Sequence, residues 1–197
     1  RVSMISKLTD HPEIKNHLDL IKQTIFDGAD KIRGIQDFAR HKSEEKLMTI
    51  DINALLSAVL KITEPKWRNE SINNGIIIEP IINFEKNLYI TGVESELRNC
   101  FANVIFNAVD AMPEGGLIKI STWFKNNYAF ISVKDTGIGM TNVVKEKIFD
   151  PFYTTKGDKG TGMGMSEVYG IVKRHNGFID INSEIGVGTE FIISFPA

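Results

Sequence analysis

The chain of 197 residues can hold one well-packed domain and an appendage. Hydrophobic residues make up 42% of it and the formal net charge is −2, so it lacks the basic excess that would favour a nucleic-acid partner. The single cysteine, Cys100, excludes an internal disulfide framework and is typical of a reducing, cytoplasmic compartment. There is no signal peptide and no apolar run of membrane-spanning length, so we expect no direct membrane contact by these residues, and membrane anchoring of the full-length protein stays open.

Residues 1–46 have a helical pattern. Apolar residues recur at steps of three and four, close to a heptad seam, and predict a long amphipathic helix over 12–46 that packs against other helices. Asp10 and Pro12 supply a helix start signal. Residues 1–8 resemble the end of an earlier helix, which predicts a truncated helical hairpin; a single helix lying on the main domain is the alternative. The seam consists of Ile14, Leu18, Ile21, Ile25, Ala29, Ile32, Ile35 and Ala39.

Residues 47–197 mix strand and helix patterns. The predicted elements are a strand at 47–52, a helix capped by Asn53, short strands at 75–79 and 81–84, a helix over 94–112, a hairpin of 117–124 and 128–134, a helix over 165–175, and a hairpin of 178–182 and 189–195. The first hairpin is expected to turn at Asn126 and Asn127.

The helix predicted over 94–112 has polar residues at spacings of 3, 4, 4 and 3, which places them on one face. They are Glu96, Asn99, Asn103, Asn107 and Asp110. Asparagine is a poor helix former because its side chain competes for backbone hydrogen bonds. Three asparagines on one face therefore indicate a need for neutral amide oxygens, and a Mg²⁺ ion already surrounded by triphosphate oxygens has that need.

Two glycine-rich loops form the second informative cluster. Asp-Thr-Gly-Ile-Gly-Met at 135–140 ends a strand, where Asp135 can accept a hydrogen bond from an exocyclic amine; an ordinary turn is the alternative. Gly-Thr-Gly-Met-Gly-Met-Ser at 160–166 precedes a helix, so successive backbone N–H groups and the helix N-terminus form a phosphate site. Lys156 can add a cation beside it. The P-loop and Rossmann signatures are absent from the sequence.

Taken together, these motifs resemble those of the GHKL ATPase superfamily, and most closely the catalytic ATP-binding domain of two-component sensor histidine kinases. Residues 96–111 resemble the N box, 135–140 the G1 box, 148–156 (Ile-Phe-Asp-Pro-Phe-Tyr-Thr-Thr-Lys) the F box, 160–166 the G2 box and 188–191 the closing Gly-Thr-x-Phe. The details are similar to the nitrogen-regulation subgroup. Tyr153 and Met163 depart mildly from the commoner Phe and Leu.

The resemblance implies an α+β fold: a two-layer α/β sandwich of the Bergerat type, with helices packed on one face of a mixed β-sheet, preceded by a long amphipathic helix. Residues 1–46 would be part of the dimerisation and histidine-phosphotransfer hairpin, and 47–197 the catalytic ATP-binding domain. It further implies the cofactors ATP and Mg²⁺, a homodimer formed through the hairpin, and a response-regulator receiver domain as the partner that takes the phosphoryl group.

Residue roles are also implied by the resemblance. Asp135 would accept from the adenine amino group, Asn107 would ligate Mg²⁺, and Lys156 would face the phosphates. The whole set implied to contact ATP is Asn103, Asn107, Asp110, Ala111, Asp135, Gly137, Ile138, Gly139, Met140, Phe152, Thr154, Thr155, Lys156, Gly160, Thr161, Gly162, Met163, Gly164, Met165 and Thr189.

The histidine that would accept the phosphoryl group is not recognisable. None of the four histidines is followed by an acidic residue on a first helix, as this family's acceptor is; they are His11, His17, His41 and His175. Because the chain begins at Arg1 rather than Met, we expect the acceptor upstream, no catalytic residue within the chain, and ATP binding without self-labelling. The alternative function is another GHKL ATPase, such as a serine-specific anti-sigma kinase or a chaperone- or repair-type ATPase.

Overall fold

The computed structural model describes residues 14, 17, 21, 46–70, 76–157 and 160–197. The chain divides into two compact units, Arg1–Glu44 and Glu45–Ala197. In the first unit the described residues, Ile14, His17 and Ile21, are helical; the rest of the helix predicted over 12–46 lies outside the described residues. Within the described part, no helix is both long and apolar enough to cross a membrane.

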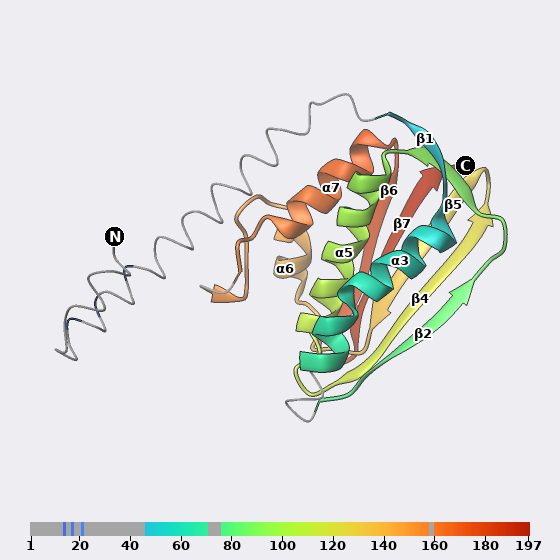
Figure 1. Cartoon of the computed structure of the whole chain (residues 1–197). Helices are drawn as coiled ribbons and strands as arrows, with labels where there is room; N and C mark the ends of the chain where they lie inside the picture. The colour runs from blue at the N-terminus through green and yellow to red at the C-terminus, as the bar shows by residue number, and fades with distance from the viewer. Residues whose placement is uncertain (1–13, 15–16, 18–20, 22–45, 71–75, 158–159) are drawn as a thin grey trace. The chain divides into compact units, whose positions relative to one another are not determined.

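The second unit is a two-layer α/β sandwich. Its main sheet has the order β2-β4-β5-β7-β6, in which only β2 and β4 pair in parallel, and β1 pairs with β3 in a separate two-stranded sheet. Helices α3, α5 and α7 lie side by side on one face of the main sheet (Figure 1). The bounds are β1 Met48–Asp51, α3 Ile52–Glu64, the π-helix η1 Pro65–Glu70, β2 Ile78–Phe84, β3 Tyr89–Gly92, α5 Glu94–Asp110, β4 Gly116–Lys125, β5 Tyr128–Asp135, α6 Asn142–Lys147, α7 Gly164–Arg174, β6 Phe178–Glu184 and β7 Gly188–Pro196. The predicted α+β architecture, with helices on one face of a mixed sheet, is confirmed.

The core lies between the sheet and these helices. Alternate residues of the central strands face the helices and are buried, among them Ile120, Ile131 and Ile193. They meet the apolar face of α5, where Phe101 and Ile105 are fully buried. Burying a side chain of this size contributes about 1.5–3 kcal/mol, so the interface fixes how α5 lies on the sheet.

Cys100 lies on the buried face of α5, as expected for a small apolar residue. Its burial raises the pKa of the thiol far above the ordinary value, with smaller contributions from the charges of Glu167 and Glu96. The thiol is therefore protonated and unreactive at neutral pH.

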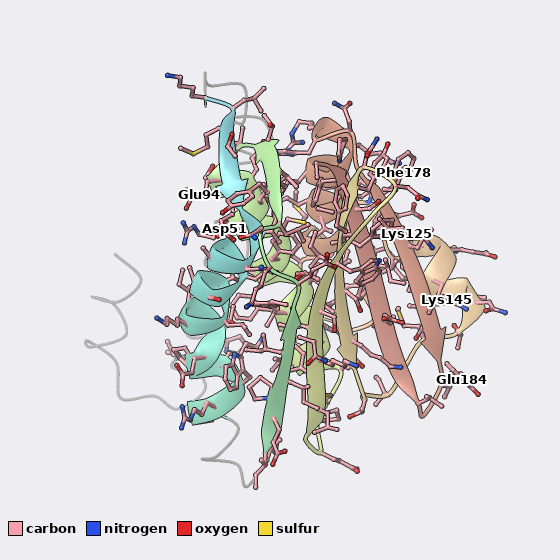
Figure 2. All side chains as sticks on the ribbon, turned by 90° about the vertical axis from the view of Figure 1, so that its right-hand side faces the viewer. Asp51, Glu94, Lys125, Lys145, Phe178 and Glu184 are labelled. Carbon is pink, nitrogen blue, oxygen red and sulfur yellow. The ribbon has the colours of Figure 1, made fainter. Side chains whose placement is uncertain are left out.

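Four local features differ from those expected from the sequence. The N-cap of α3 is Asp51 rather than Asn53, because the Asp51 carboxylate accepts from the backbone N–H of Asn53 and Ala54 at 2.9 and 3.1 Å. The two strands predicted near Pro80 are one strand, β2, which tolerates a proline because it is an edge strand. The strand β3 and the helix α6 were not predicted. Figure 2 shows α6, marked by Lys145, beside the edge strand β6 that ends at Glu184.

The predicted hairpin between β4 and β5 is confirmed. Asn126 and Asn127 both have positive φ, 52° and 63°, as a two-residue type I′ turn requires.

Candidate functional site

The loop after β5 joins the end of α5 to the hairpin of β6 and β7. The backbone N–H of Ile138 donates to the Ala111 carbonyl at the C-terminus of α5, at 2.9 Å. The Ile138 carbonyl in turn accepts from Gly186 at 2.9 Å, and the Met140 N–H donates to the Ser183 hydroxyl at 2.9 Å. The loop that the sequence singled out at 135–140 is thus fixed on both sides.

Gly139 shows how tightly this loop is packed. Its φ is +67°, and a Cβ built there would lie 1.9 Å from the Glu184 carbonyl oxygen. Only glycine combines this conformation with this approach of backbone to backbone. The neighbouring Ile138 side chain is 61% exposed, so the loop offers an apolar surface to a ligand.

Asp135, the last residue of β5, is 1% exposed and is held by backbone groups. Its Oδ1 accepts from the N–H of Gly137 at 2.9 Å and from the N–H of Thr189 at 3.1 Å. Burial raises the pKa of Asp135 above its ordinary value, and the two N–H donors offset only part of that shift. The Thr189 hydroxyl in turn lies 2.8 Å from Ser183 Oγ of the neighbouring strand β6. The carboxylate is thus fixed by the loop at Gly137 and by β7, which β6 supports.

The C-terminal part of the polar face of α5 carries the second group. The Lys156 ammonium donates to Asn107 Oδ1 at 2.8 Å and to Asp110 Oδ2 at 2.7 Å. Asp110 Oδ1 pairs with Lys66 at 2.6 Å. Burial raises the pKa of Asp110, but the hydrogen bonds and charges of the two lysines outweigh it and leave the pKa below its ordinary value.

Asn103 lies one turn before Asn107 and faces α7. Its Nδ2 donates to Glu167 Oε2 at 3.2 Å, and its Oδ1 would be 3.6 Å from a Cβ built at Gly164, the first residue of α7. Asn103 therefore stands beside the helix N-terminus that the glycine-rich segment leads into. Asn99, on the same face, is exposed.

Glu96, at the other end of the face, has a structural role. It is 6% exposed and accepts from Arg174 Nη2 at 2.8 Å and Nε at 3.1 Å. His175 lies next to this pair; its Nε2 accepts from the Val93 N–H at 3.0 Å and its Nδ1 is 2.8 Å from the Ile171 carbonyl. Glu96 is separated from Asp110 by about 21 Å of helix, so it ties α5 to α7 outside the cluster around Asn107.

The segment before α7 is folded back on itself. The Phe152 N–H donates to the Gly162 carbonyl at 3.0 Å, and a Cβ at Gly162, where φ is +67°, would lie 2.3 Å from the Phe152 carbonyl carbon. Phe152 itself has φ 66° and is 59% exposed, an unusual conformation for a bulky residue. The backbone N–H of Lys156 donates to Thr154 Oγ1 at 3.0 Å, which fixes the backbone from which the Lys156 side chain extends.

The other residues predicted in this segment lie around the start of α7. Thr155 and Thr161 are exposed, Gly160 is packed beside Thr154, Met163 occupies the N-cap position of α7, and Met165 is buried in its first turn.

Lys66 is a site residue that the sequence analysis missed. It comes from η1, more than 40 residues before Asp110 in the chain, and reaches the same carboxylate as Lys156. A lysine after a proline carries no sequence signal for such a contact, because it depends on how η1 packs on α5.

The oxygen atoms here suit a hard cation that brings other ligands. No group of three or more His, Cys, Asp or Glu that could hold a metal occurs among the described residues. Asn107 Oδ1 is instead a single neutral oxygen, which accepts a hydrogen bond from the Lys156 ammonium group. Such an oxygen suits an ion like Mg²⁺, which keeps waters or phosphate oxygens for its remaining positions.

Comparison with known proteins assigns this architecture. Residues 92–197 match the family described as histidine kinase-, DNA gyrase B-, and HSP90-like ATPases. Sporulation kinase C of Bacillus subtilis is 33% identical over 188 residues, which is 95% of this chain and 42% of that protein. Sensor kinase CckA of Brucella abortus is 35% identical over 203 residues, covering 94% of this chain and 20% of that protein. The chain thus spans less than half the length of either relative.

Solved structures agree with this assignment. The nucleotide-free catalytic domain of histidine kinase ThkA superposes with a TM-score of 0.67 at 28% identity, over 77% of this chain and 95% of that one. ThkA in complex with the response regulator TrrA has a TM-score of 0.72 at 24% identity, over 99% of this chain and 55% of that one.

Proposed function

The chain belongs to the family of histidine kinase-, DNA gyrase B- and HSP90-like ATPases, and from this premise we propose that residues 47–197 are the ATP-binding catalytic domain of a two-component sensor histidine kinase. It transfers the γ-phosphoryl group of ATP to a histidine, for relay to an aspartate of a response regulator. Two features together carry the proposal. Asp135 is a buried carboxylate fixed by backbone groups, and Asn107, Lys156 and Asp110 form a hydrogen-bonded cluster on α5.

Asp135 binds the adenine. Both of its backbone hydrogen bonds go to Oδ1, so Oδ2 is the oxygen that accepts from the adenine amino group. The base lies on the loop of Gly137, Ile138, Gly139 and Met140, beside Ala111 and Thr189. A carboxylate selects adenine because guanine presents a carbonyl oxygen where adenine presents its amino group.

The phosphates lie between α5 and the start of α7. Asn107 Oδ1 would hold Mg²⁺, with Asn103 close to the phosphates or to the waters of the ion, and the ion when bound would neutralise charge on the transferring phosphoryl group. Lys156 moves from Asn107 to the phosphate oxygens. The segment of Phe152, Thr154, Thr155, Gly160, Thr161, Gly162, Met163, Gly164 and Met165 encloses them and directs the N-terminus of α7 at them.

The acceptor histidine lies outside this domain. His175 is excluded because it is buried and both of its ring nitrogens are engaged with the backbone. We propose that residues 1–46 belong to the dimerisation and phosphotransfer hairpin, that the whole protein is a homodimer, and that its partner is a receiver domain, as the solved complex of ThkA suggests. Acid-labile label on a histidine of residues 47–197 after incubation of the chain with radiolabelled ATP would contradict this location of the acceptor.

Nucleotide binding tests the proposal directly. Calorimetry should show that Asp135→Asn weakens ATP binding about 10- to 100-fold, since a hydrogen bond to a charged group is worth about 1.5–3 kcal/mol. GTP should bind the parent chain much more weakly than ATP. Asp180→Asn, an exposed aspartate on β6, is the matched control and should bind ATP like the parent. Unchanged ATP affinity in Asp135→Asn would overturn the adenine assignment.

The other members of the superfamily are less well supported. A serine-specific anti-sigma kinase or a chaperone- or repair-type ATPase shares the fold, but the relatives reported above are sporulation and sensor kinases.

A further inference from the structure

Asp110 is the only described carboxylate in the site that is shared by two lysines. Each oxygen takes one ammonium group: Oδ1 lies 2.6 Å from Lys66 Nζ and Oδ2 lies 2.7 Å from Lys156 Nζ. Lys156 is also bonded to Asn107 Oδ1. Of the two lysines, only Lys156 comes from the segment that the proposed function places over the phosphates.

Lys66 is held in place by the packing of η1 on α5. The neighbouring Trp67 is buried at 8% exposure, and its indole N–H donates to Thr63 Oγ1 at 3.3 Å, which anchors the turn. The Lys66 ammonium lies 5.0 Å from the centroid of the Phe106 ring, one helical turn before Asp110 on α5. Lys66 is therefore positioned by the domain itself, whereas Lys156 belongs to a loop.

We propose that Lys66 is a positioning residue for the nucleotide site, which acts through Asp110 as the permanent counter-ion that frees Lys156 to bind the phosphates of ATP. This inference rests on the proposed function. When Lys156 moves to the phosphates, Asp110 would otherwise be left as an unpaired negative charge next to a polyanion. The remaining ammonium group of Lys66 neutralises it.

Removing Lys66 has two effects of the same sign. Asp110 would hold Lys156 as its sole partner, and the exposed charge of Asp110 would repel the phosphates. Both effects depend on the phosphate groups, and neither involves the adenine pocket at Asp135. The loss should therefore appear with ATP and ADP and be absent with adenosine.

The experiment is a calorimetric double-mutant cycle in the whole chain, carried out in EDTA so that no metal competes for Asp110. Lys66→Met should weaken ATP binding about 5- to 10-fold, a change of the size expected for one partly screened charge pair, and should change adenosine binding less than about twofold on the same scale. In the Asp110→Asn background the same substitution should change ATP affinity less than about twofold, because no carboxylate is left to neutralise. Lys66→Arg should retain the parent affinity, and Lys61→Met, an exposed lysine of α3, is the matched control.

Each other outcome overturns the inference. Equal weakening of ATP and adenosine means that Lys66 only supports the fold, which the thermal midpoint of the variant would show independently. An undiminished effect in the Asp110→Asn background means that Lys66 attracts phosphate directly. Lys66→Gln provides a second neutral variant if Lys66→Met does not fold. Failure of the parent chain to bind ATP would instead refute the proposed function.

Discussion

Gly139 offers a direct test of how the loop after β5 is held. In Gly139→Ala the added Cβ would lie 1.9 Å from the Glu184 carbonyl oxygen and 2.6 Å from its carbonyl carbon, both backbone atoms. The left-handed conformation costs a non-glycine residue about 1–2 kcal/mol, and overpacking against a fixed backbone adds about 1–3 kcal/mol. We therefore expect Gly139→Ala to lower the free energy of unfolding by about 2–5 kcal/mol, the sum of these two terms.

Gly186 in the neighbouring turn is the matched control. Its φ is +75°, but a Cβ there would have nothing within 4 Å, so Gly186→Ala should show only the conformational cost of about 1–2 kcal/mol. Urea denaturation of both variants at 25 °C measures the difference. If Gly139→Ala is no less stable than Gly186→Ala, the loop and the end of β6 accommodate a Cβ at position 139 without cost. The argument that the two backbones are tightly packed there would then be wrong.

Three further outcomes are expected. Glu96→Gln should lower the free energy of unfolding in urea by about 1–2 kcal/mol, because it weakens the bonds to Arg174 while the exposed side of that arginine stays hydrated. An equal loss in Glu94→Gln, whose carboxylate pairs with Arg98 on the same helix, would contradict this role. Because burial raises the pKa of Asp135 in the folded chain, the ionised carboxylate destabilises the fold above that pKa, and this unfavourable contribution disappears as the pH falls below the pKa of the unfolded state. ATP affinity should fall over the same acidic range in the parent and stay flat in Asp135→Asn. Asn127→Gly should raise the free energy of unfolding by about 0.5 kcal/mol, since Asn-Gly is the preferred type I′ pair, and a decrease would show that the Asn127 side chain stabilises the hairpin.

The elements predicted well are those whose signal is local. The periodicity of α5 gave its extent to within two residues and separated its core face from its polar face, with Cys100 buried and Asn99 exposed. The hairpin at Asn126 was readable because asparagine tolerates positive φ. In each case a few neighbouring residues contain all the necessary information.

The features that were missed depend on distant parts of the chain. Pro80 interrupts the strand pattern of β2, and only its edge position in the sheet explains why the strand continues. The pair of Glu96 and Arg174 joins residues 78 positions apart, and the contact of Lys66 with Asp110 spans more than 40. On the sequence such residues are indistinguishable from solvated surface charges, because their partners are chosen by the packing of helices.

The neutral side chain at position 107 follows from the same cluster. Asn107 and Asp110 share the Lys156 ammonium group, so Lys156 contacts one neutral amide and one carboxylate. The other oxygen of that carboxylate already pairs with Lys66. An aspartate at 107 would place a second full negative charge at hydrogen-bond distance from the Lys156 ammonium group, which strengthens its attraction to α5 even though solvent screens this partly exposed group. Lys156 would then be held to α5 and a polyanionic ligand repelled. An amide oxygen leaves Lys156 exchangeable and still ligates a cation, which accounts for asparagine on a helix that would otherwise favour a better helix former.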